Sequence, residues 1–150
     1  MQRAFGLLVL FITLLVVLAA MPAAAHDKDP DCTLRPIQFI QVPPYGSSLN
    51  LRGKVNCYGP RTHRIVVYIR VSGNWWIKPY ANSPTTSINQ TTRRWETDIT
   101  TGGQDQNATA IVVCLISARY NPPIVTGGSS LPQALYDRAH SCRQINRPAS

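Results

Sequence analysis

The chain has 150 residues, of which 44% are hydrophobic and 15% are charged, and its formal net charge is +8. A chain of this size forms one domain and does not suffice for two. The positive charge favours anionic partners, but the longest basic run is Arg93-Arg94, which argues against a dedicated nucleic-acid surface.

The N-terminal segment has the pattern of a secretory signal. Residues 4–25 carry no charge and end in three alanines. Arg3 precedes an almost unbroken apolar run over residues 7–18, and the alanines form an A-x-A cleavage site. We therefore predict a signal peptide over residues 1–25, cleaved before His26. An uncleaved membrane anchor is the alternative, but a proline and small residues at the end of the run favour cleavage, with no stable membrane insertion afterwards.

Cleavage would leave 125 residues with a formal net charge of +7. We expect residues 26–36 to be a polar lead-in and residues 37–146 to form one domain of a secreted, extracellular protein. Twelve prolines and few long stretches with helical periodicity favour strands and turns. We predict strands over residues 37–42, 49–57, 64–71, 93–100 and 108–116.

The strand over residues 64–71 is followed by a hairpin signal, Ser72-Gly73-Asn74. If Gly73-Asn74 are the two loop residues, Val71 lies opposite Trp76, and Trp75 lies on the other face. This register predicts that Trp76 belongs to the core and that Trp75 lies on the surface.

The strand over residues 108–116 is apolar on both faces, which indicates that both faces are covered. The C-terminal region is the expected cover, with a short helix within residues 130–139. Leu131, Leu135 and Ala139 would share one side of that helix.

Short strands with frequent turns predict an all-β antiparallel β-sandwich. Four cysteines follow the signal segment, and an even number in an exported chain indicates two disulfides. These are Cys32, Cys57, Cys114 and Cys142. Their spacing leaves all three connectivities open.

The order Cys57, Trp75-Trp76, Cys114 is similar to the Cys…Trp…Cys order of immunoglobulin-like domains, although Val112 stands where those domains have a corner tyrosine. That likeness implies a Cys57–Cys114 bridge between the sheets and a Cys32–Cys142 bridge between the ends of the domain. A further pattern covers roughly residues 50–145: V-Y-I, then W-W-x-K-P, then T-G-G-x-D-x-x-A-T. It resembles that of small secreted immunoglobulin-like sandwich modules, which are sometimes attached to carbohydrate-active proteins and have no established catalytic residues.

Aromatic and polar residues near the hairpin suit sugar binding, because a flat ring stacks on a pyranose and an amide or amine fixes its orientation. The candidate ligand-binding residues are Trp75, Tyr80, Tyr68, Lys78 and Asn74. The alternative interpretation is that these side chains are packed in the interior. The expected partner is a polysaccharide or another cell-surface component.

Two patterns could hold a metal. After cleavage His26 would be the N-terminal residue, and its amine and ring could bind copper together with His63 or His140. That reading makes a copper-binding sandwich or a copper-dependent oxidase the alternative function. The loop over residues 102–107 offers oxygens that suit calcium, but only one carboxylate, and its composition is equally that of a turn. We therefore predict no cofactor.

No catalytic constellation is visible. Glu96 and Asp98 lie on one strand face beside Arg94, which is typical of a solvated charge ladder and not of a glycosidase pair. Nucleophile-elbow, P-loop and dinucleotide motifs are lacking in the sequence. Asn89 and Asn107 begin N-glycosylation sequons, which operate only in a eukaryotic host.

The sequence thus predicts a secreted, non-catalytic binding module for carbohydrate or an anionic extracellular surface. A protein–protein interaction factor that uses the apolar face of residues 111–115 is the remaining alternative.

Overall fold

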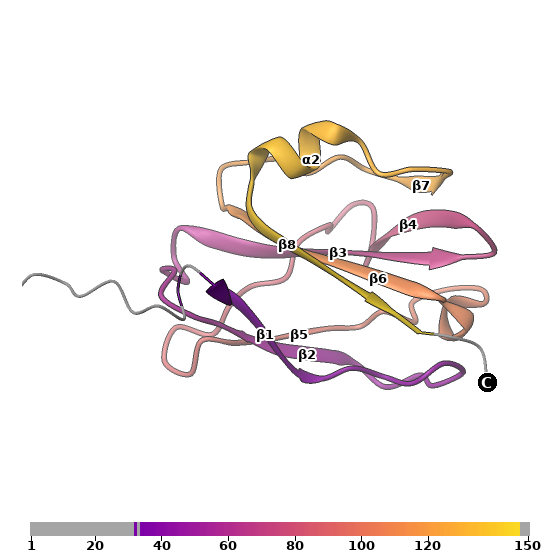
Figure 1. Cartoon of the computed structure of the whole chain (residues 1–150), viewed down its shortest axis with the longest axis horizontal. Coiled ribbons are helices and arrows are strands. Elements are labelled where there is room, and N and C mark those ends of the chain that lie inside the picture. The colour runs from indigo at the N-terminus through magenta and orange to yellow at the C-terminus, as the bar shows by residue number, and fades with distance from the viewer. Residues whose placement is uncertain (1–31, 33, 148–150) are drawn as a thin grey trace, which may run out of the picture.

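Two antiparallel sheets pack face to face in the computed structural model, which describes residues 32 and 34–147 (Figure 1). The first sheet has the order β1-β2-β5 and consists of β1 (Ile37–Gln41), β2 (Leu51–Val55) and β5 (Arg94–Thr97). The second has the order β7-β4-β3-β6-β8 and consists of β7 (Thr126–Gly128), β4 (Asn74–Lys78), β3 (His63–Val71), β6 (Ala110–Ser117) and β8 (Ala139–Asn146). A 3-10 turn, η1 (Asp105–Asn107), precedes β6, and one short helix, α2 (Gln133–Arg138), precedes β8. The predicted all-β sandwich with a short C-terminal helix is confirmed, while its immunoglobulin-like character stays a prediction.

The main core lies between the two sheets. It is built from alternating residues, because successive side chains of a strand point to opposite faces. Its fully buried members include Ile65, Val67 and Ile69 of β3, Ile111, Val113 and Leu115 of β6, and Leu51 and Val55 of β2. Each such aliphatic side chain contributes about 1.5–3 kcal/mol relative to an exposed position.

A second core covers the opposite face of the five-stranded sheet. The intervening residues of the same strands form it, among them Val66, Tyr68, Val112, Cys114 and Ile116. Residues 120–139, the covering segment, pack on this face through Val125 and the α2 residue Leu135, and Figure 1 shows α2 lying over the sheet. The strand over residues 108–116 is therefore covered on both faces, as predicted: the C-terminal region covers the face of the second core, and the smaller sheet covers the other face.

Each disulfide joins two consecutive cysteines of the chain: Cys32 with Cys57, and Cys114 with Cys142. The pairing implied by the immunoglobulin likeness is wrong. Cys114 faces the second core and not the other sheet, so it cannot reach Cys57 across the sandwich. Instead, Cys142 lies directly opposite it in the β6–β8 ladder, with Cα atoms 4.1 Å apart.

The five predicted strands are present as β1, β2, β3, β5 and β6. Three of them, β1, β2 and β5, are shorter than predicted, whereas β3 begins one residue earlier and β6 is shifted toward the C-terminus. The sequence did not indicate β7 or β8, because neither carries a regular apolar alternation. The predicted signal peptide and most of the lead-in fall outside the described residues. Across the described part of the chain, no helix is both long and apolar enough to cross a bilayer. The two disulfides are compatible with a secreted or extracellular protein.

Candidate functional site

The candidate site begins at the β3–β4 hairpin. Ser72 and Gly73 form its turn with φ values of 49° and 83°, as in a two-residue hairpin loop that needs positive φ at both positions. The turn is one residue earlier than predicted, so Trp76 lies opposite Ile69 and not opposite Val71. The strand pairing therefore shifts by two residues. Because side chains alternate with a period of two, each tryptophan stays on the sheet face that was predicted for it.

The burial of the two tryptophans is nevertheless the reverse of the prediction. Trp75 is 8% exposed, because its face of the sheet lies under the covering segment. Trp76 shares a face with Ile69 but is 39% exposed and does not belong to the main core. The prediction of a core Trp76 and a surface Trp75 is therefore wrong. Its physical cause is that β4 lies toward the edge of the five-stranded sheet, beyond the reach of the smaller sheet.

A groove of about 550 Å³, the Trp76 groove, lies between β4 and a neighbouring loop. Alternating β4 side chains line one side, namely Asn74, Trp76 and Lys78, together with Val71 and Ser72 at the hairpin. The loop over residues 102–105 lines the other side. Strand alternation is the reason that the three β4 residues share this surface.

The indole of Trp76 packs closely against Gly127 of β7. A Cβ atom at Gly127 would lie 3.3 Å from two indole carbons, and Gly127 has a φ of +104° that few other residues adopt. Because Gly127 has no side chain, it leaves the space that the ring of Trp76 occupies. The result is a supported aromatic ring whose remaining surface faces solvent and the groove.

A buried ion pair forms the base of the groove. The ammonium of Lys78 donates to Oδ2 of Asp105 and lies 3.2 Å from the hydroxyl of Thr101. The backbone N–H of Gly102 donates to the same carboxylate oxygen at 2.8 Å. These contacts fasten the loop to β4, and the opposite charges cancel. They also occupy the one carboxylate that calcium would need in this loop, and the described residues contain no cluster of three or more His, Cys, Asp or Glu residues.

The predicted sugar platform is only partly assembled. Tyr68 is fully buried and donates its hydroxyl to the carbonyl of Pro123 at 2.8 Å. Trp75 and Lys78 are buried as well, and Lys78 lines the groove only as part of the ion pair at its base. Tyr80 is 53% exposed but does not line the groove, where Asn74 does.

Sequence reasoning missed Trp76 as the exposed ring. The signal was present in the alternation, since Asn74, Trp76 and Lys78 are two residues apart and had to share a face. Which of the two faces would be covered was decided by the covering segment, and no local pattern in β4 indicates that.

The acidic residues of β5 have structural partners. Glu96 accepts hydrogen bonds from Asn50 at 2.7 Å and from Arg52 at 3.0 Å, and these bonds lower the pKa of its carboxyl. Asp98 accepts from the backbone N–H of Thr100 at 2.8 Å. Both carboxylates thus serve the surface structure, as the charge-ladder interpretation expects.

The remaining candidates are distributed over the surface and interior. Asn89 is exposed, and Asn107 is half-buried at the end of η1. Residues 111–115 are buried, so this segment offers no exposed face to a protein partner, while the wider interaction alternative stays a prediction. His26 lies outside the described residues.

No protein-family model matches this chain, and no curated protein matches it either. The residues that line the Trp76 groove are therefore the basis on which function is inferred.

Proposed function

We propose that this protein is a secreted, non-catalytic binding module that holds carbohydrate in the Trp76 groove. The observation that carries the proposal is a supported, 39% exposed tryptophan inside a groove with amide side chains on both sides. Asn74 supplies the amide on the β4 side and Gln104 supplies the one on the loop side.

The groove has the two features that sugars require. The indole of Trp76 offers an apolar face for the C–H groups of a pyranose ring. The amides of Asn74 and Gln104 each carry donors and acceptors that can pair with sugar hydroxyls. This combination of one aromatic surface and a few polar groups is typical of ligand sites that fix orientation.

The charges in the groove favour binding over hydrolysis. Asp105 is the only carboxylate among the lining residues, and it is buried and paired with Lys78. A glycosidase needs two carboxyl groups on either side of the scissile bond. The pairing with Lys78 also leaves the groove close to neutral, which suits an uncharged sugar.

The signal sequence and the disulfides support the extracellular setting. Disulfides persist in oxidising compartments outside the cytosol, where polysaccharides are accessible. The excess of basic residues over acidic ones, 15 against 7, would add attraction to acidic polysaccharides or anionic surfaces.

The test compares Trp76→Ala with Tyr80→Ala in binding to immobilised neutral and acidic polysaccharides. Both variants remove an exposed aromatic ring, but only Trp76 lines the groove. We expect Trp76→Ala to weaken binding about tenfold, equivalent to about 1.4 kcal/mol, and Tyr80→Ala to leave it unchanged. Near-UV circular dichroism verifies that both variants remain folded.

Two results would contradict the proposal. Wild-type affinity in Trp76→Ala would show that the groove is not the binding site. If both variants bind only acidic polysaccharide and lose that binding at high salt, the interaction is a general electrostatic attraction and not a sugar site.

A further inference from the structure

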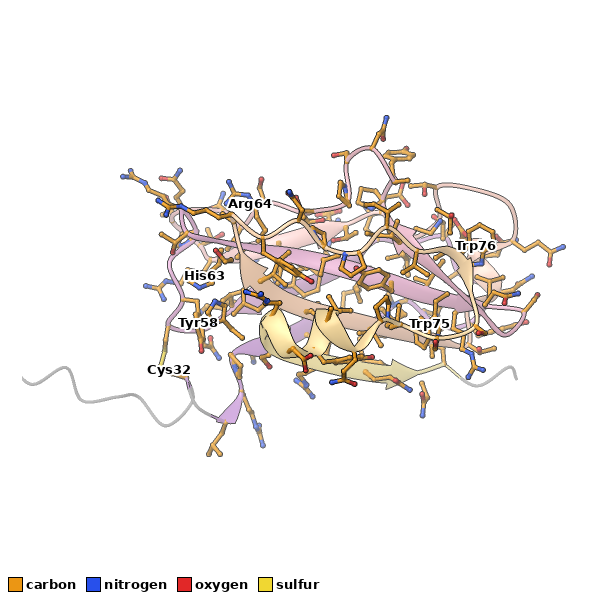
Figure 2. The ribbon with its side chains drawn as sticks, turned by 90° about the horizontal axis from the view of Figure 1, so that it is seen from above. Cys32, Tyr58, His63, Arg64, Trp75 and Trp76 are labelled. Atoms are coloured by element: carbon orange, nitrogen blue, oxygen red, sulfur yellow. A yellow bond between two sulfur atoms is a disulfide. The ribbon has the colours of Figure 1, made fainter. Side chains whose placement is uncertain are left out.

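Three rings meet at the end of the sandwich opposite the Trp76 groove, and Figure 2 labels Tyr58 and His63 at that end. The ring centroids of His63 and His140 are 4.6 Å apart. Tyr58 lies 5.0 Å from His63 and 5.3 Å from His140. The two histidines come from strands that are separated by β6, so their contact needs a local explanation.

A β-bulge supplies that explanation. The β6–β8 pairing skips His140, because Ala139 and Ser141 pair with consecutive residues of β6. Such a bulge bends the strand and turns the side chain of the extra residue, and bulges are frequent beside functional sites. Here the bulge brings His140 past the end of β6 to the ring of His63.

The hydrogen bonds of His63 determine which of its nitrogens is available. Its Nδ1 lies 3.1 Å from the carbonyl oxygen of Gly59 and 2.9 Å from the hydroxyl of Thr62. A carbonyl oxygen only accepts, so Nδ1 carries the proton and Nε2 keeps its lone pair. A backbone carbonyl that orients one imidazole nitrogen while the other stays open is the usual arrangement of metal-binding histidines.

His140 is exposed at the bulge, where its imidazole lies beside the rings of His63 and Tyr58. None of the described residues forms an ion pair with either histidine. Two adjacent imidazoles without a carboxylate partner leave ring nitrogens available to coordinate a cation.

We propose that His63 and His140 are two protein ligands of a site for a divalent transition metal that prefers imidazole, Cu²⁺ or Zn²⁺. An imidazole nitrogen lies about 2.0–2.1 Å from such an ion, which puts the ring centroid about 3.2 Å from it. Two rings bound at a right angle, as in a square-planar Cu²⁺ site, then have centroids about 4.5 Å apart, whereas the tetrahedral angle of Zn²⁺ gives about 5.2 Å. The observed 4.6 Å is closer to the Cu²⁺ arrangement, and water or the oxygen of Tyr58 would complete the shell. The site is independent of the Trp76 groove and of its proposed function.

The experiment titrates the secreted chain with ZnSO₄ and, separately, with CuCl₂. Zinc binding is followed by the ¹⁵N shifts of the imidazole nitrogens, and copper binding by the nitrogen splitting in its electron paramagnetic resonance spectrum. The sequence has three histidines, so His26→Gln is a matched control that leaves the pair intact. We expect one equivalent to bind through Nε2 of His63, and both His63→Gln and His140→Gln to lower the affinity by about tenfold or more.

Each of three results would overturn the proposal: wild-type affinity in His140→Gln, metal uptake lost only in His26→Gln, or failure of both ions to bind the wild type. His140 lies exposed on a bulge, so its replacement is compatible with folding. The ¹⁵N shifts of the wild-type chain test His63 directly if His63→Gln does not fold.

Discussion

Trp76 lies directly opposite Ile69 in the β3–β4 ladder, yet Ile69 is fully buried and Trp76 is 39% exposed. The two side chains share a face of the five-stranded sheet, but the smaller sheet covers that face only over the central strands. Toward the edge, the same face becomes the wall of a groove. The neighbouring Trp75 has the opposite environment because the covering segment reaches it.

The two tryptophans should therefore contribute to different properties, Trp75 to stability and Trp76 to binding. We expect Trp75→Ala to lower the free energy of unfolding by about 3–5 kcal/mol, because it leaves a cavity in the second core. Trp76→Ala should lower it by about 1 kcal/mol or less, since much of that ring is already in solvent. Urea denaturation of both variants measures the difference, and equal losses would contradict these environments.

The Lys78–Asp105 pair is expected to behave as a buried ion pair. Replacing one partner, as in Asp105→Asn or Lys78→Met, leaves the other charge without compensation and should cost about 3–5 kcal/mol. The double variant should recover much of that loss, because it removes both charges together. A double-mutant cycle in urea tests this, and additive losses would show that the two side chains are not coupled.

The two disulfides close loops of similar length, with sequence separations of 25 and 28 residues. The chain-entropy estimate assigns about 3.5 kcal/mol to each. Cys114 is also fully buried in the second core, whereas Cys57 is exposed. We therefore expect Cys114→Ala with Cys142→Ala to destabilise more than Cys32→Ala with Cys57→Ala in thermal unfolding; the reverse order would contradict the assigned pairing and burial.

Gly53 has a packing role opposite Trp95 in the β2–β5 ladder. A Cβ atom at this position would lie 2.3 Å from an indole carbon of Trp95. Gly53→Ala should therefore cost about 1–3 kcal/mol or more, because the indole must move within a filled core. Gly102→Ala is the control, since its Cβ would meet nothing closer than 3.9 Å. Calorimetric melting temperatures of the two variants measure the contrast, and equal temperatures would refute the close packing.

The lowered pKa of His140 makes stability depend on pH. In the unfolded chain the imidazole takes up a proton near its ordinary pKa of 6.5, whereas the folded chain binds it only at lower pH. The unfolded state then holds more protons, so the free energy of unfolding falls as the pH drops below about 6.5 and levels off below the folded pKa. His140→Gln should flatten this part of the profile in urea denaturation between pH 5 and 8. An unchanged profile would contradict the contribution of His140.

Much of the fold was predictable from local patterns. The alternation of Ile65, Val67 and Ile69 defined a strand face, and the continuously apolar strand through Val113 required cover on both sides. Leu135 was correctly expected in that cover. These inferences succeed because the period of a strand and the cost of exposing apolar surface are properties of short segments.

The candidate site was less predictable, since it depends on register and on what lies over each face. The disulfide pairing depends on which face of β6 carries Cys114. The exposure of the Trp76 ring depends on how far the smaller sheet extends over the five-stranded sheet. The contact between His63 and His140 depends on a bulge that no sequence motif announces.

The sequence by itself predicted a β-sandwich and an export signal, and it contains an even number of cysteines and enough apolar residues for two cores; the export signal stays a prediction. The tertiary structure alone decided that Cys114 pairs with Cys142, that Lys78 meets Asp105 and that Trp76 is the open tryptophan. The physical reason is that these relationships join segments far apart along the chain or depend on distant segments covering a face. Their geometry exists only once both sheets and the covering segment are in place.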